Sequence, residues 1–169
     1  MKNKQPYQRR FSANSVRPLS RSEVVKIIRA IWDEHSSRTT RKVSPDDGSD
    51  TKNESAKNFL RREIYALGRR IRSAPLSWDA DALFEEMGRT TTRPDALENL
   101  FHALLFCVYE SEQGITRQDR SLMSKELEYA YRHRVPPELL CGFLYQSTDR
   151  RRLSDRLTAG FTEPAFRSA

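Results

Sequence analysis

The chain has 169 residues, with 30 Lys and Arg against 23 Asp and Glu for a formal net charge of +7, and 37% of it is hydrophobic. That length fits one domain with extensions. Globular chains average about 45–50% apolar residues, so part of this one is expected to lie outside a packed core. No apolar run approaches the ~18 residues of a membrane span, and no apolar stretch follows the basic N-terminus as in a secretory signal. A cytoplasmic protein is therefore expected.

The first 22 residues carry six cations and no carboxylate. Their few apolar side chains do not offset the entropy lost on ordering, so residues 1–19 are expected to form a disordered basic arm. Aromatic rings interleaved with Lys and Arg are typical of segments that contact phosphates and stack on bases. The candidate nucleic-acid-binding residues of this arm are Lys2, Lys4, Tyr7, Arg9, Arg10, Phe11 and Arg17.

A short amphipathic helix is predicted over residues 20–35. Ser20 and Glu23 form a capping-box pattern, and an apolar stripe follows at helical spacing. Because a linker separates this helix from the rest, we expect it to be detached and to bury its stripe against either the C-terminal domain or another protein. In the second case it would dock into a partner's groove or be exchanged between two copies to form a homodimer. The candidate docking residues are Val24, Ile27, Ile28, Ile31 and Trp32.

Residues 36–55 are predicted to be a flexible linker, since they contain one Val and no aromatic side chain. Residues 56–159 are predicted to form the folded domain, a small all-α bundle of about five to six helices, followed by a loose tail at 160–169. No segment alternates with the period of two that marks a half-buried strand. Helices are expected over about residues 54–73, 79–87, 94–109, from 117 to the prolines at 136–137, 139–144 and 148–159.

The helix expected over residues 54–73 has two faces of different character. Its apolar stripe is formed by Leu60, Ile64, Leu67 and Ile71, and the opposite face is basic and aromatic. A row of guanidinium groups at helical spacing suits a phosphate backbone. We call Arg62, Tyr65, Arg69 and Arg72 the Arg-rich face.

A third basic cluster, Arg150, Arg151 and Arg152, follows near the C-terminus. Against these clusters stands an acidic stretch, since residues 77–115 hold two basic and eight acidic side chains. That stretch could fold against the Arg-rich face and neutralise it internally. The sequence leaves both arrangements open.

Signals for catalysis and for metal binding are weak. The six glycines are dispersed, so no glycine-rich phosphate loop is present. The three histidines lack metal-ligand spacing, and no Cys-x-x-Cys pair occurs. Cys107 and Cys141 lie in apolar runs, as small buried hydrophobic residues do. No catalytic residue, metal or cofactor is therefore expected.

Two functions follow from these patterns. The first is a non-enzymatic accessory protein that binds nucleic acid, DNA or RNA, through the arm and the Arg-rich face, largely independently of base sequence. The alternative is an adaptor subunit of a larger assembly that docks through the helix at 20–35.

Overall fold

The structure, a computed structural model, describes residues 17–40, 54–74, 80–90, 99–108, 115–147 and 152–164. Every regular element in these ranges is helical, which confirms the predicted all-α fold. The predicted site residues at positions 2–11, 150 and 151 lie outside them. The elements are α1 (Arg21–Thr40), α2 (Ala56–Arg72), α3 (Ala80–Glu86), α4 (Leu100–Val108), α5 (Arg117–Arg132), the 3-10 turn η2 (Pro137–Leu139), α6 (Leu140–Ser147) and α7 (Leu153–Thr158).

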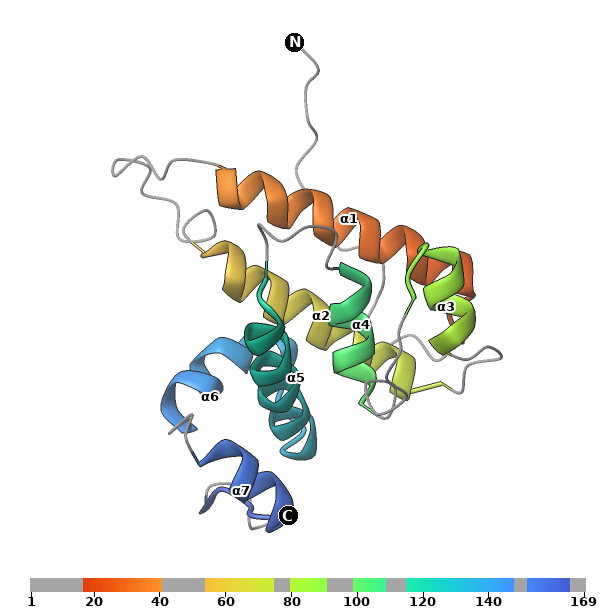
Figure 1. Cartoon of the computed structure of the whole chain (residues 1–169). Coiled ribbons are helices and arrows are strands. Elements are labelled where there is room, and N and C mark those ends of the chain that lie inside the picture. The colour runs from red at the N-terminus through yellow and green to blue at the C-terminus, as the bar shows by residue number, and fades with distance from the viewer. Residues whose placement is uncertain are drawn as a thin grey trace.

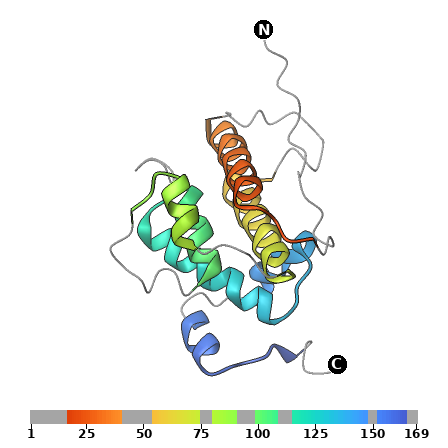
Figure 2. The ribbon, with the colours of Figure 1, turned by 90° about the vertical axis from the view of Figure 1, so that its right-hand side faces the viewer.

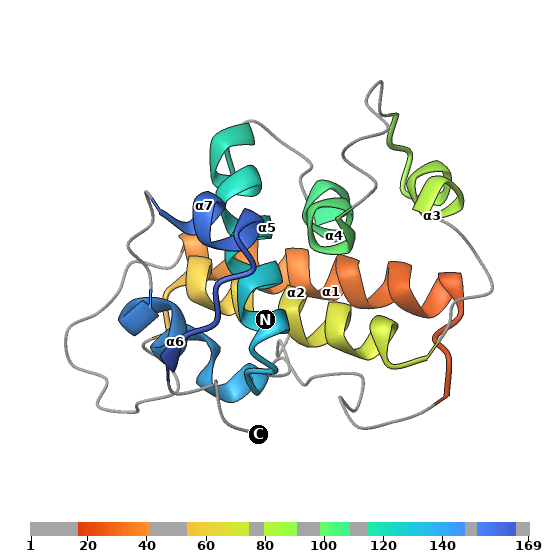
Figure 3. The same ribbon diagram turned by 90° about the horizontal axis from the view of Figure 1, so that it is seen from below.

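The helices pack around α2. Helices α1 and α2 lie side by side and run in opposite directions (Figures 1 and 3). Helix α4 packs on both of them, and α5 packs on α2 and α4. Helix α3 contacts α1, while η2 and α6 contact α2. Helix α7 packs on α5, at the end of the bundle far from α1 (Figures 1 and 2).

Helix α1 is not detached, and that expectation is wrong. Its apolar stripe packs on α2 and α4, which leaves Val24, Ile27, Ile28 and Ile31 at most 4% exposed. Trp32 is half-buried against the same core. The chain's own helices supply enough apolar surface to cover the stripe, and burying side chains of this size stabilises by roughly 1.5–3 kcal/mol each. Of the two surfaces left open by the sequence, the C-terminal domain is the one that α1 uses.

The core centres on the contact between α2 and α4. Phe59, Leu60 and Leu67 of α2 are fully buried, as are Phe101 and Leu104 of α4. Gly68 lets the two helices approach closely, since a Cβ atom there would lie 2.4 Å from Cε1 of Phe101. Helix α2 is therefore buried on more sides than its single apolar stripe indicates.

Two predicted helix starts are confirmed, whereas α1 continues to Thr40, past the predicted end at residue 35 and into the segment predicted to be a linker. Ser20 accepts a hydrogen bond from the Glu23 backbone N–H at 3.3 Å, and the Glu23 carboxylate accepts one from the Ser20 N–H at 2.8 Å, which completes the capping box. Thr116 caps α5 by accepting from the Asp119 N–H at 3.0 Å. Because these contacts join residues three apart, local sequence suffices to predict them.

Candidate functional site

The Arg-rich face does not form a row of solvated cations. Tyr65 is fully buried, and its hydroxyl donates a 2.7 Å hydrogen bond to the backbone carbonyl of Val135. Arg69 donates to the same carbonyl at 2.8 Å. Burial raises the pKa of Tyr65 well above its usual value, so the hydroxyl stays protonated. Half of the predicted face is therefore part of the contact between α2 and the end of α5.

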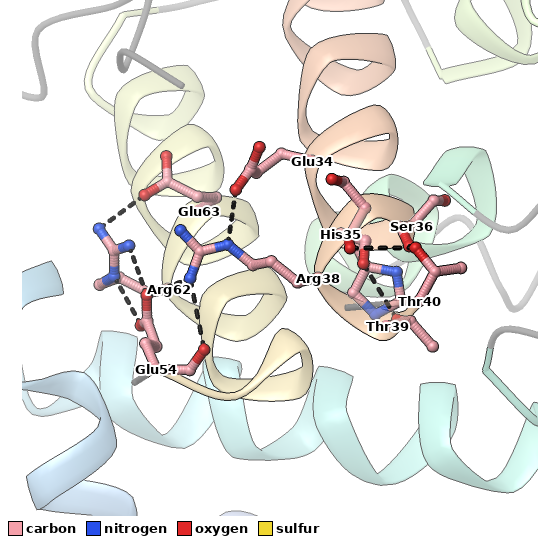
Figure 4. A network of polar contacts seen from close by, with 10 residues as sticks. Glu34, His35, Ser36, Arg38, Thr39, Thr40, Glu54, Arg62 and Glu63 are labelled. Atoms are coloured by element: carbon pink, nitrogen blue, oxygen red, sulfur yellow. Dashed lines mark hydrogen bonds and ion pairs between the residues drawn. The ribbon is translucent and has the colours of Figure 1, made fainter. Parts of the chain in front are cut away.

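Arg62 belongs to a chain of alternating charges that joins the end of α1 to the start of α2 (Figure 4). Its guanidinium binds both carboxylate oxygens of Glu54, at 3.0 and 2.8 Å, and contacts Glu63 at 2.7 Å. The Glu54 hydrogen bonds raise the pKa of Arg62. Arg38 continues the chain, with one nitrogen 2.8 Å from Glu34 and another 3.5 Å from Glu54. This network holds the two helix ends together.

Arg72 is engaged by a carboxylate and by two rings. It binds both oxygens of Glu128, at 3.3 and 2.7 Å, a bidentate geometry that fixes the guanidinium plane. Its central carbon lies 4.8 Å from the Phe101 ring centroid and 4.3 Å from that of Tyr131. A phosphate would have to displace Glu128 to reach this guanidinium.

A buried ion pair that the sequence did not reveal links α2 to α5. Arg61 Nε lies 2.8 Å from a carboxylate oxygen of Glu126, and both side chains are under 10% exposed. A partly exposed pair, Lys57 with Asp119 at 2.7 Å, lies one turn earlier on α2. Four cations of α2, namely Lys57, Arg61, Arg62 and Arg72, are thus paired with described carboxylates that lie outside the acidic stretch at 77–115. From that stretch, within the described ranges, Glu86 binds Arg21 of α1 at 2.5 Å.

The other described candidates for nucleic-acid binding lie at the two ends of the described chain. Arg17 is largely exposed and forms an ion pair with Glu23 at 2.5 Å. The hydrogen bond from Arg17, with those from Ser20, lowers the pKa of Glu23 to about 2. Arg152 is exposed just before α7. The structure does not bring these two arginines together with the Arg-rich face into one surface.

A second polar cluster, also missed by the sequence, joins α5 to the residues after α7. Tyr129 donates a 2.5 Å hydrogen bond to Glu163, and Arg156 donates to the same carboxylate oxygen at 2.8 Å. The Glu163 backbone N–H donates to Nε2 of His133 at 2.9 Å, while Nδ1 of His133 lies 2.8 Å from the Tyr129 carbonyl. Nδ1 therefore carries the proton, and the ring is neutral in this arrangement. Burial first, then Glu163, raises the pKa of Tyr129 to about 12.

The buried side chain of His35 makes the free energy of unfolding depend on pH. Its ring stacks on Trp32 at 5.6 Å, its Nδ1 is buried without a hydrogen-bond partner, and burial lowers its pKa. The unfolded chain then takes up this proton below about pH 6.5, before the folded chain does. We expect the free energy of unfolding to fall as pH drops through that value.

The His35→Phe variant tests this term, because it keeps a stacked ring and removes the titration. Urea unfolding at pH 7.5 and at pH 5.5 should show a smaller loss of stability in the variant than in the wild type. Equal losses in both proteins would assign the pH dependence to other groups.

The thiols carry no sign of activation. Cys107 is fully buried, and burial raises its pKa to about 12. Cys141 is half-buried, with its sulfur 3.9 Å from the Asn58 carbonyl, and its pKa is also raised. Both thiols are free. Among the described residues, no group of three or more His, Cys, Asp or Glu side chains is arranged to hold a metal ion.

No protein-family model, curated protein or solved structure matches this chain. Within the described ranges, no helix has the length and apolar content needed to cross a membrane. The function is therefore inferred from the residues themselves. Four exposed cations of the bundle form no ion pair with another described residue, namely Lys26, Arg29, Arg117 and Arg134.

Proposed function

We propose that this chain is a non-enzymatic accessory protein that binds nucleic acid through its basic N-terminal arm, with the helical bundle as a scaffold. The supporting observation is the difference between the cations of the arm and the cations of α2. Residues 1–16 hold four cations and no carboxylate, interleaved with Tyr7 and Phe11. By contrast, each of the six cations of α2 is engaged by a carboxylate, a backbone carbonyl or a serine of the bundle.

This division changes which residues are proposed to contact phosphate. Polyanion binding gains free energy mainly by releasing counterions, and a cation already paired with a carboxylate has few to release. The arm cations Lys2, Lys4, Arg9 and Arg10 therefore carry the proposal, with Tyr7 and Phe11 stacking on bases. The exposed Arg152, with Arg150 and Arg151, forms a secondary contact.

The dependence of nucleic-acid affinity on salt concentration tests the proposed phosphate contacts. For about six phosphate contacts, affinity for a 20-mer duplex should fall about 10³-fold between 50 and 200 mM salt. Replacing the four arm cations with Gln should lower the affinity at 50 mM salt at least about tenfold and flatten the slope. Fluorescence anisotropy with duplex DNA, single-stranded DNA and RNA of equal length would also rank the substrates.

The matched control removes the same charge from the bundle. Replacing Lys26, Arg29, Arg117 and Arg134 with Gln changes the net charge equally but leaves the arm intact. This variant should retain the wild-type affinity within about threefold. Equal losses in the two variants would show that only net charge matters, and a flat salt dependence of the wild type would contradict the proposal.

The alternative function, an adaptor subunit that docks through residues 20–35, ranks second. Docking would require α1 to leave α2 and α4, and so would expose the fully buried Ile28 and Ile31. A partner would have to replace that apolar contact before any net affinity appears.

A further inference from the structure

The segment after α6 is attached to the bundle in an unusual way. We call residues 152–164, which contain α7, the C-terminal strap. Leu153 is the one strap side chain that is buried within the described residues, whereas α1, α4 and α5 bury six each. Figures 1 and 2 show α7 at the edge of the bundle, beside α5. A segment with so little buried apolar surface belongs to the least stable part of a fold.

Polar contacts with α5 take the place of an apolar seal. Lys125 donates to the Ser154 hydroxyl at 2.6 Å, and Arg132 donates to the Leu157 carbonyl at 2.7 Å. Arg156 donates to the Ser147 carbonyl at 2.7 Å, which ties the strap to the end of α6. Each such bond exchanges for a bond to water when the strap lifts, so its net contribution is only a fraction of its gross strength.

Glu163 is where these contacts converge. Its carboxylate accepts hydrogen bonds from Tyr129 and Arg156, and its backbone N–H donates to His133. The bond from Tyr129 joins α5 to the strap and is charge-assisted because its acceptor is a carboxylate, a type about twice as strong as a neutral hydrogen bond. Arg156 belongs to the strap itself and holds the Glu163 carboxylate in place. Gly160, with φ at +64°, turns the chain after α7 so that Glu163 returns to α5.

An aromatic cluster lies at the point where Glu163 attaches. The ring centroids of Tyr129 and His133 are 4.4 Å apart, and that of Phe143 lies 5.9 Å from Tyr129 and 5.4 Å from His133. Tyr129 and His133 are buried in the closed arrangement. Lifting the strap would expose their polar edges to water without moving α1, α2 or α4.

We propose that the C-terminal strap is a latch, meaning that it opens as a separate unit while the bundle stays folded. Glu163 holds the latch closed, and its opening controls access to the Tyr129–His133–Phe143 cluster. Opening separates the strap from α5 and leaves the core between α2 and α4 intact. Loss of the Glu163 carboxylate therefore shifts the equilibrium toward an open strap on a bundle that stays folded.

Hydrogen exchange of the full chain, read by mass spectrometry, tests the latch. In the Glu163→Ala variant, amides over residues 153–163 should exchange at least about tenfold faster than in the wild type. The reason is that the variant lacks the charge-assisted hydrogen bond that holds the strap on α5. In the wild type and in the variant, strap amides should exchange faster than amides of α2, because they become exposed while the bundle stays folded. Tyr129→Phe removes the α5 partner of the same hydrogen bond and should accelerate strap exchange by a similar factor.

The control lies in the same segment. Asp155→Asn removes one negative charge from an exposed strap position and should change strap exchange less than about twofold. Strap amides that exchange at the wild-type rate in Glu163→Ala would overturn the proposal. So would strap amides that are as strongly protected as those of α2 in the wild type, which would mean that the strap opens only when the bundle unfolds.

Discussion

Replacing Glu126 with Ala is expected to lower the free energy of unfolding by about 3–5 kcal/mol, because it leaves the Arg61 guanidinium buried without its carboxylate. The pair is 2.8 Å apart, and the two side chains are 7% and 2% exposed. Small domains are typically stable by only about 5–15 kcal/mol. The variant should therefore show a large fall in urea midpoint with an unchanged m-value.

Two controls separate the buried charge from charge loss in general. Asp119→Ala breaks the partly exposed pair with Lys57 on the same two helices and should cost about 1 kcal/mol or less from the ion pair, with a further contribution from the lost Thr116 contact. The double variant Arg61→Met with Glu126→Leu should recover most of the stability that Glu126→Ala loses, since it removes both charges. A double variant as unstable as Glu126→Ala would contradict this explanation.

Gly68→Ala is expected to destabilise the bundle by about 2–3 kcal/mol, although Ala is the better helix former by about 1 kcal/mol. The added Cβ would lie 2.4 Å from Cε1 and 2.8 Å from Cδ1 of Phe101. That ring is fully buried and stacks on Tyr65 at 5.8 Å, so it has no free space to move into. Overpacking therefore outweighs the gain in helix propensity.

Gly142→Ala provides the opposite result in the same chain. Gly142 lies within α6, and a Cβ atom there would meet nothing within 4 Å. The variant should gain about 0.5–1 kcal/mol from helix propensity alone. Thermal unfolding of both variants tests the pair, and destabilisation by Gly142→Ala would show that α6 makes a contact at this position.

The Arg-rich face was predicted from the spacing within one helix, which carries no information about the other helices that pack on it. Four apolar positions on α2 predicted its buried stripe, and Leu60, Ile64, Leu67 and Ile71 are buried. For the opposite face the sequence left two arrangements open, contact with phosphates or neutralisation by the acidic stretch, and neither includes the packing of α5 and η2 on α2. The partners of Arg61, Tyr65, Arg69 and Arg72 lie 56 to 70 residues away in the sequence. No local spacing encodes pairs this far apart, so neither the Arg61–Glu126 ion pair nor the contacts of Glu163 with Tyr129 and His133 could be predicted.

The sequence by itself determined the helical class, the caps at Ser20 and Thr116 and the concentration of cations in the N-terminal arm, because helical periodicity and capping depend on residues three to four apart. Only the tertiary structure decided that α1 joins the bundle and that Arg61, Arg62 and Arg72 of α2 pair with carboxylates of the bundle. An amphipathic stripe shows that a surface must be covered, but the sequence does not show which segment covers it. In the same way, the sequence shows each cation but not the distant carboxylate that pairs with it. Those choices depend on which helices pack together.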